Sequence, residues 1–179
     1  QSYVNEFPQV KKQTGKHNGT FIIPDTTEGW ADALRTGLTT WFNGEDIGFD
    51  YSHIRSAGEP LKVKGGRASG PEPLQVMLDF ARSRIIARAG DKLRPLDAHD
   101  IMCSVGSAAV SGGMRRTAMI SLFDWDDEEM RNCKNGDNLE NNEQRWNANN
   151  STVWTNGGVN QVQLLRQMLE MVEGERGEP

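Results

Sequence analysis

The feature that most constrains the fold of this chain is an alternation of short apolar runs with longer segments of helical periodicity. The short runs have the length and composition of strands, and the longer segments repeat apolar residues at three- and four-residue steps. Strands that alternate with helices indicate an α/β fold. The expected strands cover residues 20–23, 47–54, 118–123 and 149–154.

Helices are expected in the intervening segments. Asp25 and Glu28 have the spacing of a capping box, so the first helix should begin there and end near Gly44. Asp97 and Asp100 predict a second start of this kind. The expected helices cover residues 25–43, 71–90, 97–110, 124–133 and 159–172, with a loop over 135–142.

The start of the chain differs from the rest. Residues 1–19 are polar and show little periodicity, so we expect a loop or a loosely held arm, followed by one domain over residues 20–179. The chain starts at Gln1 without a methionine and stops in a polar segment, and both ends suggest a piece of a longer protein.

Composition excludes several classes of protein. The 179 residues are 36% hydrophobic, which is enough for a buried core. No apolar run could cross a bilayer and no secretion leader is visible, so a cytoplasmic protein without a membrane partner is expected. The net charge of −5 and the pI near 5.3 argue against a nucleic acid polymer as partner, but they allow small anions.

Cysteine and histidine give no sign of a metal site. Cys103 and Cys133 cannot supply a disulfide framework or a four-ligand zinc site, and the three histidines are scattered. Both cysteines lie in helical, partly apolar contexts, which favours a structural role.

Two glycine-arginine segments, 64–71 and 111–117, are candidate anion sites. A Gly-Gly pair allows a close approach of the backbone, and arginine offers a planar fork that matches phosphate oxygens. The first segment precedes a helix, whose N-terminal amides would face the same anion. A helix C-cap and a solvated arginine pair remain alternatives. The candidate binding residues are Gly65, Gly66, Arg67, Ser69, Gly70, Gly112, Gly113, Met114, Arg115, Arg116 and Thr117.

Three runs of this sequence resemble the large catalytic chain of adenosylcobalamin-dependent (class II) ribonucleotide reductases. They cover residues 65–74, 93–103 and 112–122. Shorter segments at 24–30, 126–131 and 148–151 fit the same family in the same order. The likeness therefore extends over roughly residues 21–154, and more weakly over the last helix.

The resemblance implies part of a ten-stranded α/β barrel, formed here by residues 20–179. It implies reduction of ribonucleotides to deoxyribonucleotides by a thiyl radical, which the cofactor adenosylcobalamin generates. The family's catalytic cysteine motifs do not match Cys103 or Cys133, so no catalytic residue is expected here and the segment should be inactive alone. The remaining parts of the reductase chain and a thioredoxin-like reductant would complete the enzyme.

The resemblance also implies a regulatory role. Residues 111–117 match the family's specificity loop, which lies between the deoxynucleotide effector and the base of the ribonucleotide substrate. Arg115 and Arg116 would contact phosphates or the base, and Arg67 with Ser69 would donate to phosphates or ribose. Two alternatives stay open, a stand-alone deoxynucleotide-binding regulatory module and one subunit of a split reductase. Part of a barrel should also leave apolar strand edges exposed.

Overall fold

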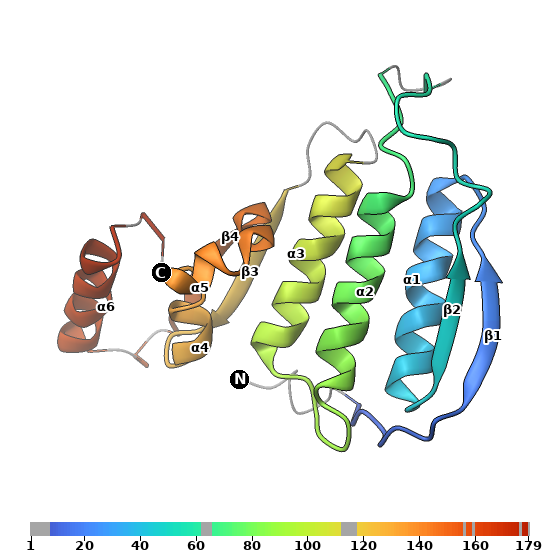
Figure 1. Ribbon diagram of the computed structural model, residues 1–179. Coiled ribbons are helices and arrows are strands. Elements are labelled where there is room, and N and C mark those ends of the chain that lie inside the picture. Colours follow the sequence, from blue (N-terminus) through green and yellow to red (C-terminus); the bar gives the residue numbers. More distant parts are fainter. Residues whose placement is uncertain are drawn as a thin grey trace. The chain divides into compact units, whose positions relative to one another are not determined.

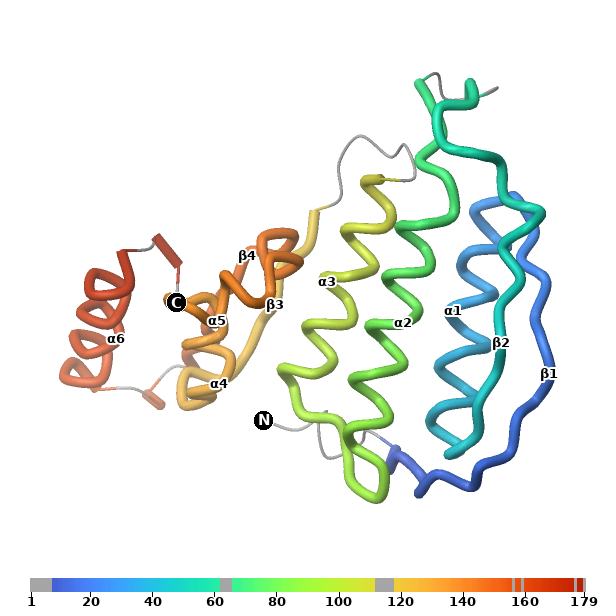
Figure 2. Tube along the Cα trace, in the orientation of Figure 1, coloured from blue at the N-terminus to red at the C-terminus, as the bar shows by residue number. Residues whose placement is uncertain are grey.

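The computed structural model describes residues 8–61, 66–111, 118–155, 157–158, 160–175 and 177–178. These residues form two compact units, which divide in the sequence between residues 117 and 118 (Figures 1 and 2). The division falls within the stretch 20–179, for which one domain was expected. None of the described helices combines the length and the apolar character that a membrane span requires.

The first unit contains a parallel strand pair and a layer of three helices. β1 and β2 pair in parallel, with Phe21 opposite Phe49, and α1 connects them. In Figure 1, α1, α2 and α3 lie side by side, and α1 also contacts β2. The elements are β1 (His17–Ile22), α1 (Thr27–Phe42), β2 (Asp46–Asp50), α2 (Glu72–Ile86) and α3 (Pro95–Ser111).

The core of this unit uses the apolar faces that the periodicity predicted. Trp41 of α1 packs edge-on against Phe49 of β2, with ring centroids 6.1 Å apart. Ala33, Leu74 and Ile85 are completely buried. An α/β arrangement with these helices is therefore confirmed for the described part of the chain.

Two predicted helix starts are wrong in detail. Thr26, not Asp25, caps α1: its backbone is extended and its Oγ1 accepts a hydrogen bond from Gly29 N at 2.9 Å. Asp25 forms an ion pair instead. Asp97 lies inside α3, which begins at Pro95, and its carboxylate accepts a hydrogen bond from Arg94 N at 3.0 Å. The Asp25 carboxylate is engaged by Arg55, whereas the Asp97 carboxylate accepts from the Arg94 amide at the start of α3 and also from the side chains of Arg88 and Arg94.

Residues 10–14 form a strap across the helix ends. They have no regular secondary structure, like the loop that was one of the two expectations, but hydrogen bonds hold them in place. Val10 is fully buried and its backbone pairs with Asp91 and Gly90, each at 2.8 Å. Lys11 N donates to Phe42 O at 2.9 Å, which satisfies a carbonyl at the end of α1. β1 then begins at His17, inside the expected arm.

The second unit contains another parallel strand pair. β3 pairs with β4 in register, from Met119 opposite Ala148 to Asp124 opposite Val153. The segment 135–142, expected to be a loop, contains the short helix α5. The elements are β3 (Met119–Asp124), α4 (Glu128–Arg131), α5 (Asp137–Glu140), η2 (Glu143–Asn147), β4 (Ala148–Val153) and α6 (Gln161–Glu173).

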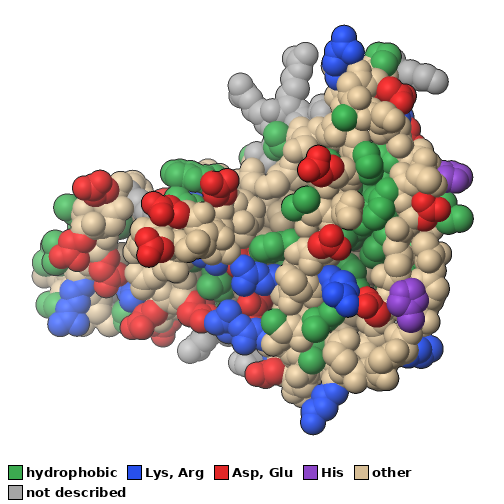
Figure 3. All heavy atoms as spheres, viewed as in Figure 1, with side chains coloured by type: hydrophobic (Ala, Val, Ile, Leu, Met, Phe, Trp, Pro, Cys, Tyr) green, Lys and Arg blue, Asp and Glu red, His purple; other side chains and the backbone are tan. Residues whose placement is uncertain are grey.

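Apolar side chains on one face of β3 remain open to solvent. Ile120 and Leu122, on the same face of β3, are 60% and 65% exposed, while Phe123 points inward and is 7% exposed. The space-filling view shows hydrophobic side chains beside charged ones on α6 (Figure 3). The predicted apolar stripe of α6 is exposed at Val162, Leu165, Leu169 and Val172.

Candidate functional site

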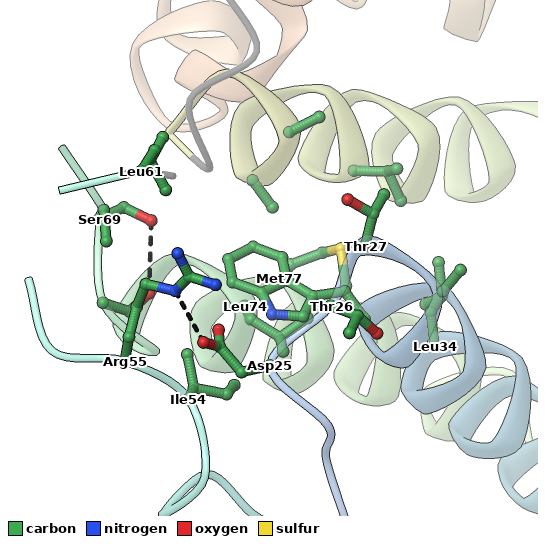
Figure 4. Close-up of a pocket in the computed structure, with 17 residues that line it drawn as sticks. Asp25, Thr26, Thr27, Leu34, Ile54, Arg55, Leu61, Ser69, Leu74 and Met77 are labelled. Atoms are coloured by element: carbon green, nitrogen blue, oxygen red, sulfur yellow. Dashed lines mark hydrogen bonds and ion pairs between the residues drawn. The ribbon is translucent and has the colours of Figure 1, made fainter. Parts of the chain in front are cut away.

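A pocket of about 620 Å³ lies in the first unit, between α1, α2 and α3 (Figure 4). Its volume is in the range of small-molecule sites, which is about 300–1,000 Å³. Apolar side chains from all three helices form most of its walls. These are Trp30, Ala31 and Leu34 of α1, Leu74 and Met77 of α2, and Val105, Ala108 and Ala109 of α3.

Two charged residues, Asp25 and Arg55, lie together in the lining of the pocket. Arg55 Nε donates to Asp25 Oδ2 at 2.7 Å, and both side chains are about one-third exposed. Figure 4 shows the two side chains facing each other beside Ile54. Asp25 follows β1 and Arg55 follows β2, so the pair lies beyond the carboxyl ends of two parallel strands, where α/β folds commonly bind ligands. No other residue in this lining carries a full charge.

The first glycine-arginine segment is only partly at the pocket. Ser69 and Gly70 line it, and Ser69 Oγ donates to Gly70 O at 3.3 Å. Arg67 is absent from the lining, because its Nη1 donates to Gly58 O at 2.8 Å and fastens the turn. Gly66 is exposed near this turn, and Gly65 lies outside the described residues.

Gly70 has a clear conformational reason to be glycine. Its φ is +78°, and an added Cβ would lie 3.1 Å from Ala57 N. The close approach brings the turn against the segment that carries Arg55. Gly70 therefore shapes the charged part of the pocket through the backbone.

The second glycine-arginine segment cannot be placed. Gly112, Gly113, Met114, Arg115, Arg116 and Thr117 all lie outside the described residues. The helix that leads to them is described, and its last turns contribute Val105, Ala108 and Ala109 to the pocket wall. The pocket and this segment are thus joined by α3.

Sequence reasoning missed the two charged pocket residues. Asp25 was assigned to a helix cap, and Arg55 was assigned no role. The available signal was position: each charged residue follows a predicted strand closely. Only the parallel pairing of β1 with β2 brings the two together.

Comparison with known proteins bears on the same residues. The family model for the insertion domain of B12-dependent ribonucleotide reductase matches residues 5–83. An adenosylcobalamin-dependent ribonucleoside-triphosphate reductase of Euglena gracilis is 36% identical over 133 residues, which is 73% of this chain and 18% of the relative. The corresponding enzyme of Lactobacillus leichmannii is 37% identical over 139 residues, or 74% of this chain and 19% of the relative.

A solved structure agrees with these sequence matches. The crystal structure of a B12-dependent (class II) ribonucleotide reductase superposes with a TM-score of 0.71 at 25% identity, covering 86% of this chain and 26% of that chain. The chain belongs to the class II ribonucleotide reductase family. The resemblance inferred from the sequence motifs is therefore confirmed.

The matches also show how much of each relative this chain covers. The chain spans only 18–20% of the length of the first curated relatives. The match to an insertion domain was not anticipated, and it includes β1, α1, β2 and most of α2. Both Asp25 and Arg55 fall within it.

The cysteines of the reductase segment are buried. Cys103 Sγ lies 3.5 Å from His99 Nε2, and Cys133 Sγ accepts a hydrogen bond from Asn150 Nδ2 at 3.1 Å. Each thiol is packed within its own unit. Among the described residues, no group of three or more potential metal ligands comes together.

Proposed function

We propose that this chain is part of an adenosylcobalamin-dependent ribonucleotide reductase and that its pocket binds a deoxynucleotide effector, which controls the choice of ribonucleotide substrate. The observation that carries the proposal is the position of the pocket. One part holds Arg55, Asp25 and the turn at Ser69 and Gly70, and another wall is the end of α3. The residues that follow α3 resemble the family's specificity loop.

The lining divides naturally among the parts of a nucleotide. The apolar walls accept a base, whose faces are poorly hydrated. The Arg55 guanidinium matches phosphate oxygens in charge and geometry. If Arg55 turns to a phosphate, the Asp25 carboxylate is released as a pure acceptor for a sugar hydroxyl. A nucleotide therefore replaces the ion pair with two new polar contacts.

In the complete enzyme, the reaction would convert ribonucleoside triphosphates to deoxyribonucleotides, since the relatives are named for triphosphate reduction. Thiyl-radical chemistry requires an accessible cysteine near the substrate. Cys103 and Cys133 are buried, so we assign the catalytic cysteines and the site of a thioredoxin-like reductant to other parts of the enzyme.

The described residues do not fit adenosylcobalamin. The pocket suits a drug-sized ligand, whereas a corrin ring with its adenosyl group is much larger. We therefore assign the cofactor to other parts of the enzyme and the regulatory nucleotide to this one. The exposed apolar face of β3 is suited to pack within the family's α/β barrel.

Calorimetric titration of the chain with dATP tests the proposal. We expect saturable binding, and we expect Arg55→Ala to weaken it about 10- to 100-fold, the range for lost hydrogen bonds to a charged group. Arg35→Ala is the matched control, because Arg35 pairs with Asp32 at an exposed site and does not line the pocket. Absence of binding to the unaltered chain, or equal binding by the two variants, would contradict the proposal.

A further inference from the structure

We infer that Ala108 and Ala109, near the end of α3, set the size of the nucleobase that the pocket accepts. The inference rests on the proposed function and names two residues that determine its specificity. Both alanines line the pocket, together with Val105 one turn earlier. Residues at these spacings share one face of a helix.

This wall differs from the opposite walls in the size of its side chains. The α1 wall has the large Trp30 and Leu34 beside Ala31, and α2 contributes Leu74 and Met77, whereas the last turn of α3 in the lining presents only two single methyl groups. At Ala108 and Ala109, the limit of the pocket is therefore set almost by the helix backbone itself. A larger side chain at either position would take up space that a ligand could use.

The α3 wall is part of a packed interior, which it shares with Leu74 and Met77 of α2. Ala108 is 4% exposed and belongs to the hydrophobic core of the first unit. Interiors of this kind are close-packed and transmit strain instead of yielding. Met77 has an unbranched, adaptable side chain. Alanine has no side-chain rotamer to change, so a ligand that reaches Ala108 or Ala109 is limited by the backbone of α3.

The polar residues indicate which part of the nucleotide meets this wall. Figure 4 shows Arg55 and Asp25 on the side of Ile54, while the yellow-green helix α3 passes along the opposite side. A phosphate and sugar bound at the ion pair direct the base toward α3. The base is then the part of the ligand in contact with Ala108 and Ala109.

The same wall connects base size to regulation. Ala109 stands two residues before Ser111, the last residue of α3, and the segment 112–117 follows directly. A purine reaches further toward the alanines than a pyrimidine does. Purines therefore contact the last turn of α3 more closely than pyrimidines do, and this turn leads into the predicted specificity loop.

The test compares the four deoxynucleoside triphosphates on one variant. They share sugar and triphosphate, so the ratio of their affinities isolates the base. We expect Ala109→Leu to weaken dATP and dGTP binding about tenfold or more, as overpacking a filled site does, and to weaken dTTP and dCTP about threefold at most. Ala109 is half-buried, so this variant perturbs folding less than a change at Ala108.

Val110→Leu is the matched control, because Val110 is the next residue, is 43% exposed and does not line the pocket. It should leave all four affinities within about twofold. If Ala109→Leu does not fold, the smaller Ala109→Val should change the purine-to-pyrimidine ratio in the same direction.

The possible outcomes distinguish a failure of this inference from a failure of the proposed function. If the unaltered chain binds none of the four nucleotides, the proposed function fails and the inference falls with it. If nucleotides bind and Arg55→Ala weakens them, but Ala109→Leu affects purines and pyrimidines equally, only the assignment of base size to α3 is overturned.

Discussion

Because Gly44 has no side chain, the end of α1 can lie directly against residues 10–14. Gly44 ends α1 with a φ of +74°, a backbone conformation that glycine adopts without strain. A Cβ at this position would lie 2.2 Å from Lys12 O. The sequence correctly marked Gly44 as a helix terminator, but it gave no sign that residues 10–14 pass so close to it.

This close approach predicts a difference between two glycine substitutions. Gly58 has a similar φ of +88° but nothing within 4 Å of an added Cβ. Gly58→Ala should therefore cost about 1–2 kcal/mol of unfolding free energy for the left-handed backbone alone. Gly44→Ala should cost about 1–3 kcal/mol more, because it also displaces the strap. Urea unfolding measures both, and equal losses would show that the strap yields freely.

At the scale of elements, a buried carboxylate holds the corner between α2 and α3. Asp97 is 2% exposed and accepts hydrogen bonds from Arg88 Nε at 2.7 Å and from Arg94 N at 3.0 Å. Burial by itself raises the pKa of Asp97, but the hydrogen bonds from Arg94 and Arg88 outweigh it and lower the pKa below its usual 3.8. The ionised form is thus the one that stabilises the corner.

Asp97→Asn should destabilise the first unit by about 3 kcal/mol at neutral pH, since it removes one partner of a buried ionic cluster. The pH dependence has a defined sign. The folded pKa is lowered, so the stabilisation is complete above the unfolded value near 3.8 and is lost as the pH falls through the folded pKa. The variant should lose this part of the acid dependence.

Thermal unfolding between pH 2 and pH 7 would measure both effects. Asp32→Asn is the control, because Asp32 pairs with Arg35 on the surface, where such pairs contribute about 0–1 kcal/mol. If Asp97→Asn lowers the unfolding free energy as little as Asp32→Asn does, the buried carboxylate does not stabilise the corner.

Periodicity predicted the long elements well because burial of one face dictates it. The apolar stripes of α1 and α2 and the short runs of β1 and β3 were all visible in the sequence. Long-range partners were not visible. Asp25 looked like a cap because local spacing cannot show Arg55, thirty residues away. The parallel pairing of β1 with β2 brings the two residues together.

At the scale of the whole molecule, each of the two small sheets has few strands and leaves part of its faces uncovered. Each contains two parallel strands, and parallel sheets are normally covered on both faces. Ile120 and Leu122 of β3 are exposed instead. The solved relative of the same family is roughly three times as long. The packing of β3 proposed above, within a longer chain, would cover this face.

The exposed face predicts self-association of the isolated chain. Replacing Ile120 and Leu122 by Thr should reduce sedimenting oligomers while changing the unfolding free energy by only about 1 kcal/mol, because threonine is well tolerated in strands. Phe123→Thr, on the buried side of the same strand, should instead cost about 3 kcal/mol or more. If the double variant unfolds as readily as Phe123→Thr, the face is already covered.

The way residues 10–14 are held predicts which of these positions tolerate a change of amino acid. The main-chain amides of this strap donate to Phe42, Gly44 and Asp91, and most amino acids except proline can form these bonds. The Thr14 hydroxyl adds a side-chain hydrogen bond to Gly44 O. Where only main-chain bonds hold the stretch, the side chain should vary more freely than the path of the backbone. Of these positions, the fully enclosed Val10 is the one where drift should be slow.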